Sequence, residues 1–312
     1  LYHTLAGGPF AGDMLRFNGS QLIRNTGGVD TVLLTIPGTG PGGSTVFSSF
    51  LIQRDDNSVL FGESSSNDIW LVPLQPNAAN PPGVLVNVFF NYDAVLWDMN
   101  TMLVSAKTDN FSGPDNDILA VDLTTGATDQ IAKVPGASGP IALTPDGDLL
   151  YVTSSLAFPA PPNSSDILRF SRSQILGAFG PSELALSDAE VVVGGVAGGS
   201  SMVVDAQGDI IVTIPGINDV VEFPRLGTEP ARTLLQSGSL FPGGIQLFGN
   251  AGFFSPFQRA ERATIQIFET DFFMTAQVRQ LTGTDPPLTV PGQPLPTRTL
   301  PVPPGPPTLS LP

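Results

Sequence analysis

The stretch NDILAVDL, Asn116 to Leu123, decides the fold because near-copies of it recur along the chain. In each copy a polar residue precedes a short run rich in aliphatic and aromatic residues. The other copies are GDMLRF from residue 12, NDIWLVPL from 67, SDILRFS from 165, NDVVEFPR from 218 and the weaker ATIQIFE from 263. A repeat of about 50 residues has the size of one four-stranded propeller blade.

The segment before each copy also repeats: an alternating apolar run, a tight polar turn and a second run. Examples are FSSFLIQ-RDDNS-VLFGES, DAVLWD-MNT-MLVSAK, GPIALT-PDGD-LLYVTS, GSSMVV-DAQGD-IIVTIP and GGIQLF-GNAG-FFSPF. Alternation of this kind predicts β-hairpins, so Asp146 and Asp148 are interpreted as the corner of a hairpin and not as a metal or catalytic pair. A further β-favouring stretch follows each copy, such as PGVLVNVFF or AEVVVGG.

These repeats predict an all-β fold, a six-bladed β-propeller of four-stranded antiparallel blades over residues 1–283. LYHTLAGG, GDMLRFN and QLIRNT would supply the second to fourth strands of the N-terminal blade, and its first strand would come from PPLTVPG, within residues 286–292. Such closure removes open sheet edges. The alternative is five complete blades with an N-terminal half blade.

An acidic residue heads five of the copies, namely Asp13, Asp68, Asp117, Asp166 and Asp219. We expect it to accept backbone N–H bonds at the entrance of the third strand and to hold the preceding loop. Two short segments, SRSQILGAFG and SELALSDAE, could each form about a turn of helix in an insertion over residues 156–190. Insertions of this kind often carry binding functions.

GGSSMVVDAQGDIIVTIPGINDVVEF, Gly198 to Phe223, resembles the NHL repeat, and GPIALTPDGDLLYVTSS resembles the related YVTN repeat. The resemblance implies the propeller architecture, which occurs in lyases, lactonases, receptor ectodomains and scaffolds alike. Streptogramin-lyase-like members are expected to use a central histidine. The only histidine here is His3, near the start of the chain, where we expect it to be solvated.

The similarity to gluconolactonase-type propellers implies a divalent metal, Ca²⁺ or Mg²⁺, held over the channel by carboxylate and amide oxygens. The candidate ligands are Glu63, Asp109, Asn110 and Asn218. Their simpler interpretation is that they are loop residues bonding their own backbone. We predict no catalytic residues and no resident cofactor.

The composition restricts the partners. The chain has 13 basic and 28 acidic residues, a net charge of -15 and no cysteine. This field repels nucleic acid, and the absence of cysteine excludes disulfides and thiolate sites. No apolar run reaches the roughly 20 residues of a membrane helix. The acidic, lysine-poor composition favours an extracellular or cell-surface protein whose signal peptide has been removed.

Residues 284–312 differ abruptly from the rest, since 11 of these 29 residues are proline. Proline-rich chains run as extended polyproline II, so this segment should form an arm. If the arm contacts a second copy, head-to-tail assembly into filaments or a surface layer follows. The residues expected to make this contact are Pro294, Pro296, Arg298, Leu300, Pro303 and Pro304.

The leading functional hypothesis is therefore a non-catalytic structural or interaction propeller that binds proteins, above all copies of itself. The first alternative is a metal-dependent lactonase-like hydrolase. The second is a propeller that binds a peptide or a glycan.

Overall fold

The computed structural model describes residues 2–5, 8–39, 48–107, 115–135, 139–153, 161–205, 207–214, 217, 219–225, 230–236, 241–249, 263–270, 275–282 and 309–310. Side chains are described up to residue 236, apart from those of residues 2, 4, 115 and 135.

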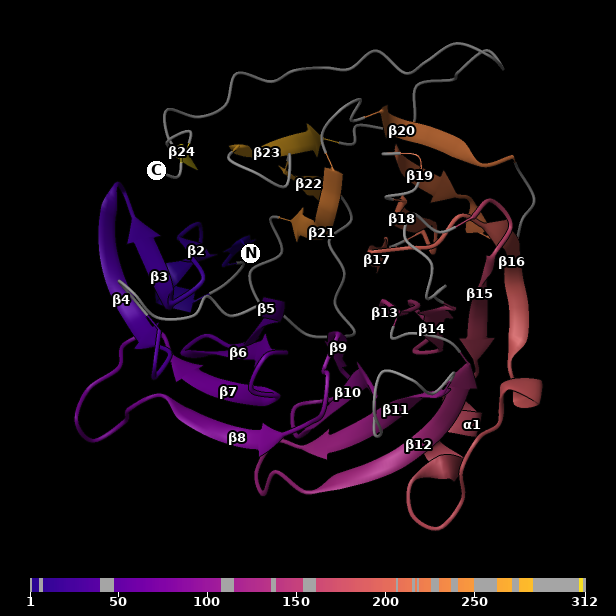
Figure 1. Ribbon diagram of the computed structural model, residues 1–312, viewed down its shortest axis with the longest axis horizontal. Coiled ribbons are helices and arrows are strands. Elements are labelled where there is room, and N and C mark those ends of the chain that lie inside the picture. Colours follow the sequence, from indigo (N-terminus) through magenta and orange to yellow (C-terminus); the bar gives the residue numbers. More distant parts are fainter. Residues whose placement is uncertain are drawn as a thin grey trace.

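The described chain forms consecutive four-stranded antiparallel sheets, each built from four strands in sequence order (Figure 1). The first three are blade 1, with β1 (Tyr2–Thr4), β2 (Met14–Phe17), β3 (Gln21–Thr26) and β4 (Val29–Thr35); blade 2, with β5 (Ser48–Asp55), β6 (Ser58–Glu63), β7 (Asp68–Pro73) and β8 (Gly83–Asn87); and blade 3, with β9 (Asp93–Leu96), β10 (Thr101–Ala106), β11 (Asp115–Asp122) and β12 (Thr128–Pro135).

Blades 4 and 5 follow the same plan. Blade 4 contains β13 (Ile141–Leu143), β14 (Leu149–Val152), β15 (Ser165–Phe170) and β16 (Glu190–Val196), and blade 5 contains β17 (Ser201–Val204), β18 (Ile210–Ile214), β19 (Asp219–Phe223) and β20 (Arg232–Gln236). A further sheet contains β21 (Phe241–Gly249), β22 (Ala263–Thr270), β23 (Thr275–Thr282) and β24 (Leu309–Ser310).

Each of the five blades has a β-bulge near the start of its third strand. It lies between the third and fourth residues of the shared repeat in blades 2 to 5, and between Leu22 and Ile23 in blade 1. The pairing of the third with the fourth strand shifts there by one residue. The extra residue on the fourth strand is aliphatic in every blade: Leu33, Leu85, Ile131, Val192 and Leu234. Because a bulge bends the outer strand and increases its twist, it shapes every blade alike.

The prediction of six blades is wrong, since five sheets share this blade plan. The sheet β21–β24 pairs β22 with β23 without any register shift, and its fourth strand has only two residues. It lies beside blade 5, where β21 contacts β17 and β18 (Figure 1).

The N-terminal blade is complete in itself, which corrects the expectation of a missing first strand. The stretch VDTVLLT, not assigned to a strand from the sequence, forms β4, and GDMLRF supplies the second strand instead of the third. Blade 1 therefore needs no strand from the C-terminal segment. Residues 286–292, the predicted donor, lie outside the described residues.

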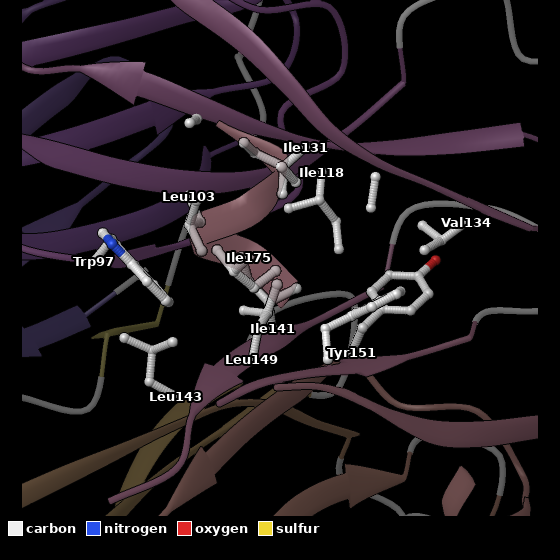
Figure 2. Packing of buried hydrophobic residues seen from close by; sticks show 14 of the residues in the cluster. Trp97, Leu103, Ile118, Ile131, Val134, Ile141, Leu143, Leu149, Tyr151 and Ile175 are labelled. Atoms are coloured by element: carbon white, nitrogen blue, oxygen red, sulfur yellow. The ribbon is translucent and has the colours of Figure 1, made fainter. Parts of the chain in front are cut away.

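Apolar side chains alternate between the two faces of each blade and fill the spaces between neighbouring blades. Leu149 and Tyr151 of β14 face blade 3, whereas Leu150 and Val152 face blade 5. Figure 2 shows the cluster between blades 3 and 4, with Trp97 and Tyr151 among its members. Strands buried on both faces explain the nearly continuous apolar runs in the sequence.

The insertion after β15 forms α1 (Arg172–Ala178) and a 3₁₀ turn, η2 (Leu186–Asp188), which confirms the short helical segments expected there. Ser171 and Gln174 form a capping box at the start of α1. Leu184 pairs with the outer edge of β12: its N–H donates to the carbonyl of Ile131 over 2.9 Å, and its carbonyl accepts from Lys133. This part of the insertion thus covers a sheet edge. Within the described residues, no helix is long and apolar enough to cross a membrane.

Candidate functional site

One end of each blade collects the start of its first strand, the end of its second strand and the start of its third strand. In blade 3, Asp93 pairs with Ser105, and Ser105 pairs with Ile118. We call this side of the molecule the mouth face. It carries most of the buried polar side chains of the described residues, among them Glu63, Asn91, Ser105, Lys107, Asn116, Asp117, Ser165 and Thr213.

Glu63, the last residue of β6, is fully buried and closes its own turn. Its carboxylate accepts hydrogen bonds from the backbone N–H groups of Ser65 and Ser66 and from the Ser66 hydroxyl. Both carboxylate oxygens are used in this way. Of the four predicted metal ligands, Glu63 alone is described, because Asp109, Asn110 and Asn218 lie outside the described residues.

Asn91 joins blades 2 and 3. Its amide nitrogen donates to the carbonyl of Glu63 over 3.1 Å and to that of Val88 over 3.2 Å, and its amide oxygen accepts from the hydroxyl of Ser49. The side chain is fully buried, so these bonds satisfy groups that would otherwise be costly to bury.

Tyr92 reaches two blades further along the chain. Its hydroxyl donates to the carbonyl of Ser200, just before β17, over 3.1 Å, and the Ser200 hydroxyl lies 2.7 Å from that of Thr213. Burial, and secondarily the nearby Asp93 carboxylate, raises the pKa of Tyr92, so its phenol stays neutral. The residue thus ties blade 3 to blade 5.

Asp93 opens β9 and links blade 3 to blade 4. One carboxyl oxygen accepts from the N–H of Ala94 over 2.9 Å, and the other accepts from the N–H of Ile141 at the start of β13 over 3.0 Å. Burial raises the pKa of Asp93 to about 7, against the opposing effect of these two donors. A carboxyl group whose pKa is raised in this way stays protonated in the folded protein at pH values where the unfolded chain has lost the proton. It therefore lowers the stability of the fold as pH rises from about 4 to 7.

A third set of polar contacts lies between blades 3 and 4. The amide of Asn116 donates to the hydroxyl of Ser105 over 3.2 Å and lies 3.5 Å from the hydroxyl of Tyr151. Burial raises the pKa of Tyr151. In Figure 2 the Tyr151 ring lies among the apolar side chains and its hydroxyl oxygen lies on the side of Val134.

Sequence reasoning missed Asn91, Tyr92 and Asp93. Their signal is the polar triplet NYD at the start of a strand, and this triplet has no counterpart in the sister blades. A search for repeats finds sequence patterns that recur in every blade. These three residues make contacts with other blades that occur only at this one place among the described residues.

His3 is buried, which corrects the expectation of a solvated residue. It lies on β1 opposite Leu15, which belongs to the apolar cluster between blades 1 and 2. Burial lowers the pKa of His3 to about 4, so the imidazole is neutral at pH 7. Its Nε2 has no hydrogen-bond partner among the described residues.

Three of the recurring aspartates accept hydrogen bonds from the fourth strand of their blade, which corrects the expectation that they mainly hold the preceding loop. Asp68 accepts from Asn87 on β8, Asp117 from Gln130 on β12, and Asp166 from the backbone of Gly195 on β16. Asp68 also accepts from Ser66 in its preceding loop. Asp13 heads a second strand, so it belongs to the opposite face, where it accepts from Thr26 on β3.

Asp146 and Asp148 form the hairpin corner that the sequence predicted. Gly147 between them has φ +84°, the left-handed region that favours glycine. Asp148 accepts from the backbone N–H of Arg172 over 2.8 Å, and Asp209 repeats this contact with Arg225 over 2.7 Å in blade 5.

Two further groups of predictions concern a metal site and the contact residues of the C-terminal arm. Within that part of the chain, no three His, Cys, Asp or Glu side chains gather closely enough to hold a metal ion. The predicted contact residues of the arm lie outside it: Pro294, Pro296, Arg298, Leu300, Pro303 and Pro304.

Comparison with known proteins gives likenesses of structure only, because no protein-family model and no curated protein sequence matches this chain. A chain in the crystal structure of a nidogen/laminin complex superposes with a TM-score of 0.57 at 12% identity, covering 86% of this chain and 88% of that one. XC5397 from Xanthomonas campestris, described as a gluconolactonase, gives 0.55 at 13% identity, with 90% and 86% covered.

Puromycin hydrolase gives a TM-score of 0.53 at 13% identity, and the match covers 88% of this chain but 45% of that protein. These neighbours include enzymes, and at such identities they share a fold and not a demonstrated activity. Together with the repeated blades, they show that the chain is a β-propeller of repeat-type architecture.

Proposed function

We propose that this protein is a non-catalytic interaction propeller that binds proteins, including copies of itself, outside the cell or at its surface. One observation carries the proposal: the polar side chains at the mouth face are used as structural links. Tyr92, Asp93 and Asn91 join blades, and Glu63 closes its own turn.

Metal-dependent hydrolysis would require oxygen ligands that are free to converge on a cation. A Ca²⁺ ion takes six to eight oxygen ligands, so several carboxylate or amide oxygens must converge on one point. Oε2 of Glu63 already accepts two bonds and Oε1 accepts one, so a cation at this carboxylate would compete with the N–H and O–H donors of the turn. Buried donors left without an acceptor cost about 1–3 kcal/mol each.

A lactonase-like hydrolase is the second candidate, and Asp93 is the observation that favours it. A carboxyl group with a pKa near neutrality suits proton transfer, and Asp93 lies at the mouth face. In support of the first proposal, both oxygens of this carboxyl already accept backbone N–H bonds.

Glu63→Gln tests the two candidates. An amide places its own NH₂ against donors, so we expect a loss of about 1.5–3 kcal/mol in the free energy of unfolding. Because the wild-type side chain is committed to its turn, millimolar Ca²⁺ or Mg²⁺ should not raise the melting temperature of either protein. Ser66→Ala is the matched control, since it removes one hydroxyl donor and keeps the carboxylate.

The opposite result would favour the hydrolase. Ligand binding raises stability by RT ln(1 + [L]/Kd), so a functional cation site would raise the melting temperature of the wild type and of Ser66→Ala. Loss of that rise in Glu63→Gln, together with metal-dependent hydrolysis of a lactone by the wild type, would contradict the proposal.

A further inference from the structure

The sequence Asn-x-Ser occurs three times in the chain, beginning at Asn18, Asn110 and Asn163, and its middle residue is never proline. Each copy falls between the second and the third strand of a blade: β2 and β3, β10 and β11, and β14 and β15. The described ends of these strands lie at the mouth face, so Asn18 and Asn163 share one side of the molecule. Asn110 lies outside the described residues.

Asn18 is exposed at the corner between β2 and β3. Its Oδ1 accepts hydrogen bonds from the backbone N–H of Ser20 over 3.0 Å, from that of Gln21 over 2.8 Å and from the Ser20 hydroxyl over 3.1 Å. All three bonds use the amide oxygen. The amide nitrogen, Nδ2, can therefore carry a substituent while the turn keeps these bonds.

Asn163 is exposed as well, within a turn in which residues 161–164 all face solvent. Its φ is +59°, in the left-handed region that asparagine adopts more readily than most residues. The fold thus presents a second asparagine of this kind at the mouth face, three blades along the chain from Asn18.

Ser165, the last residue of the Asn163 sequence, is 2% exposed, and its hydroxyl has no hydrogen-bond partner among the described residues. Blades 2, 3 and 5 have asparagine at this position of the repeat: Asn67, Asn116 and Asn218. The side chains of Asn67 and Asn116 form hydrogen bonds there. A buried hydroxyl without a partner lowers stability, so the described structure offers no use for serine at this position.

We propose that Asn163 and Asn18 carry N-linked glycans, which are attached before the chain folds. Serine two residues after an exposed asparagine marks it as the acceptor, and a hydroxyl that folding buries is accessible only in the unfolded chain. The inference rests on the proposed extracellular location. Glycans at these two sites would stand on the mouth face and leave the rim and the opposite face to protein partners.

The transfer uses an oligosaccharide linked to a lipid pyrophosphate as the donor. Nδ2 of Asn163 bonds to the anomeric carbon of the first sugar, the bond from that carbon to the phosphate oxygen breaks, and the lipid pyrophosphate leaves with the electron pair. Nδ2 releases one proton in the same step. The same reaction at Asn18 leaves Oδ1 unchanged, so its turn contacts remain.

Mass spectrometry of the full chain, isolated from the organism that makes it, tests the proposal. Peptide N-glycosidase in heavy-oxygen water converts each glycosylated asparagine into a labelled aspartate, so we expect the label at Asn163 and Asn18. Ser165→Ala, made in the same organism, should abolish the label at Asn163 and keep it at Asn18. Ser165→Thr should keep both. An unlabelled Asn163 in the wild type, or a labelled one in Ser165→Ala, would overturn the proposal.

The melting temperature of the unmodified chain, produced in cells that lack the transfer reaction, gives a second measurement. Ser165→Ala should leave it unchanged or raise it, because the variant removes a buried hydroxyl without a partner. Asn116→Ala, the matched change in blade 3, should lower it because Asn116 donates to Ser105. A lower melting temperature in Ser165→Ala would give the hydroxyl a structural role and contradict its assignment to the acceptor sequence.

The two proposals fail separately. A wild type without glycans would leave the interaction function standing. Metal-dependent lactone hydrolysis, in contrast, would contradict the non-catalytic function whether or not glycans are attached.

Discussion

His3 is a titratable residue whose imidazole is buried in blade 1, so it should make the stability of the fold depend on pH. Burial lowers its pKa from 6.5 to about 4. Between these values the unfolded chain binds a proton that the folded protein excludes. Stability from this residue is therefore present above pH 6.5 and is lost as pH falls towards 4.

From pH 7.5 to pH 4, the free energy of unfolding of the wild type should fall by roughly 3 kcal/mol more than that of His3→Leu. Denaturant unfolding of both proteins at several pH values measures it, and the shared titration of other groups cancels in the difference. A difference that does not change with pH would show that the imidazole is solvated or protonated in the folded state.

At the scale of single residues, turn positions were predictable and links between blades were not. Asp146 and Asp148 could be interpreted from the sequence because a turn depends on neighbours in the chain and recurs in each blade. Tyr92 bonds to Ser200, more than a hundred residues away, and nothing local in the sequence marks such a contact. Chain position near a terminus likewise suggested solvation for His3, although packing decided its burial.

At the scale of elements, the shared bulge defines the blade. The third strand pairs evenly with the second, and the one-residue shift comes only where it meets the fourth. An extra residue reverses which side chains face the neighbouring blade beyond it. Ile131 is such a residue, fully buried between blades 3 and 4 and shown in Figure 2.

Ile131→Ala should lower the free energy of unfolding by about 2–5 kcal/mol, because it opens a cavity in a closely packed cluster. Val192→Ala is the matched control at the same bulge position of blade 4, where the side chain is partly exposed, and should cost about 1 kcal/mol. Urea unfolding of the two variants provides the comparison. Equal costs would mean that the bulge residue is not part of the core.

The repeat could predict which stretches form strands, yet it placed three of them wrongly within the N-terminal blade. GDMLRF resembles the third strands of the other blades but forms β2, since residues 29–35 add a strand after β3. An acidic residue followed by an apolar run suits any strand that enters a two-sided core. Position within a blade depends on how many strands follow before the next blade begins, and VDTVLLT, which forms β4, was not counted as a strand.

At the scale of the whole molecule, the arrangement of blade 1 removes the need for closure by the C-terminal segment. All four of its strands come from residues 2–35, and apolar side chains of β2, β3 and β4 pack against blade 2. In the described part of the chain, the C-terminal residues contribute only β24, which pairs with two residues of β23.

Deletion of residues 286–312 should therefore leave a folded propeller. The loss of a two-residue strand removes bonds worth about 1 kcal/mol each, so we expect the melting temperature to fall by no more than about 2–4 °C and the transition to stay cooperative. Calorimetry of the full and shortened chains measures both quantities. If residues 286–292 instead completed the N-terminal blade, their removal would expose a full strand edge and its apolar face, and the shortened chain would lose its cooperative transition or aggregate.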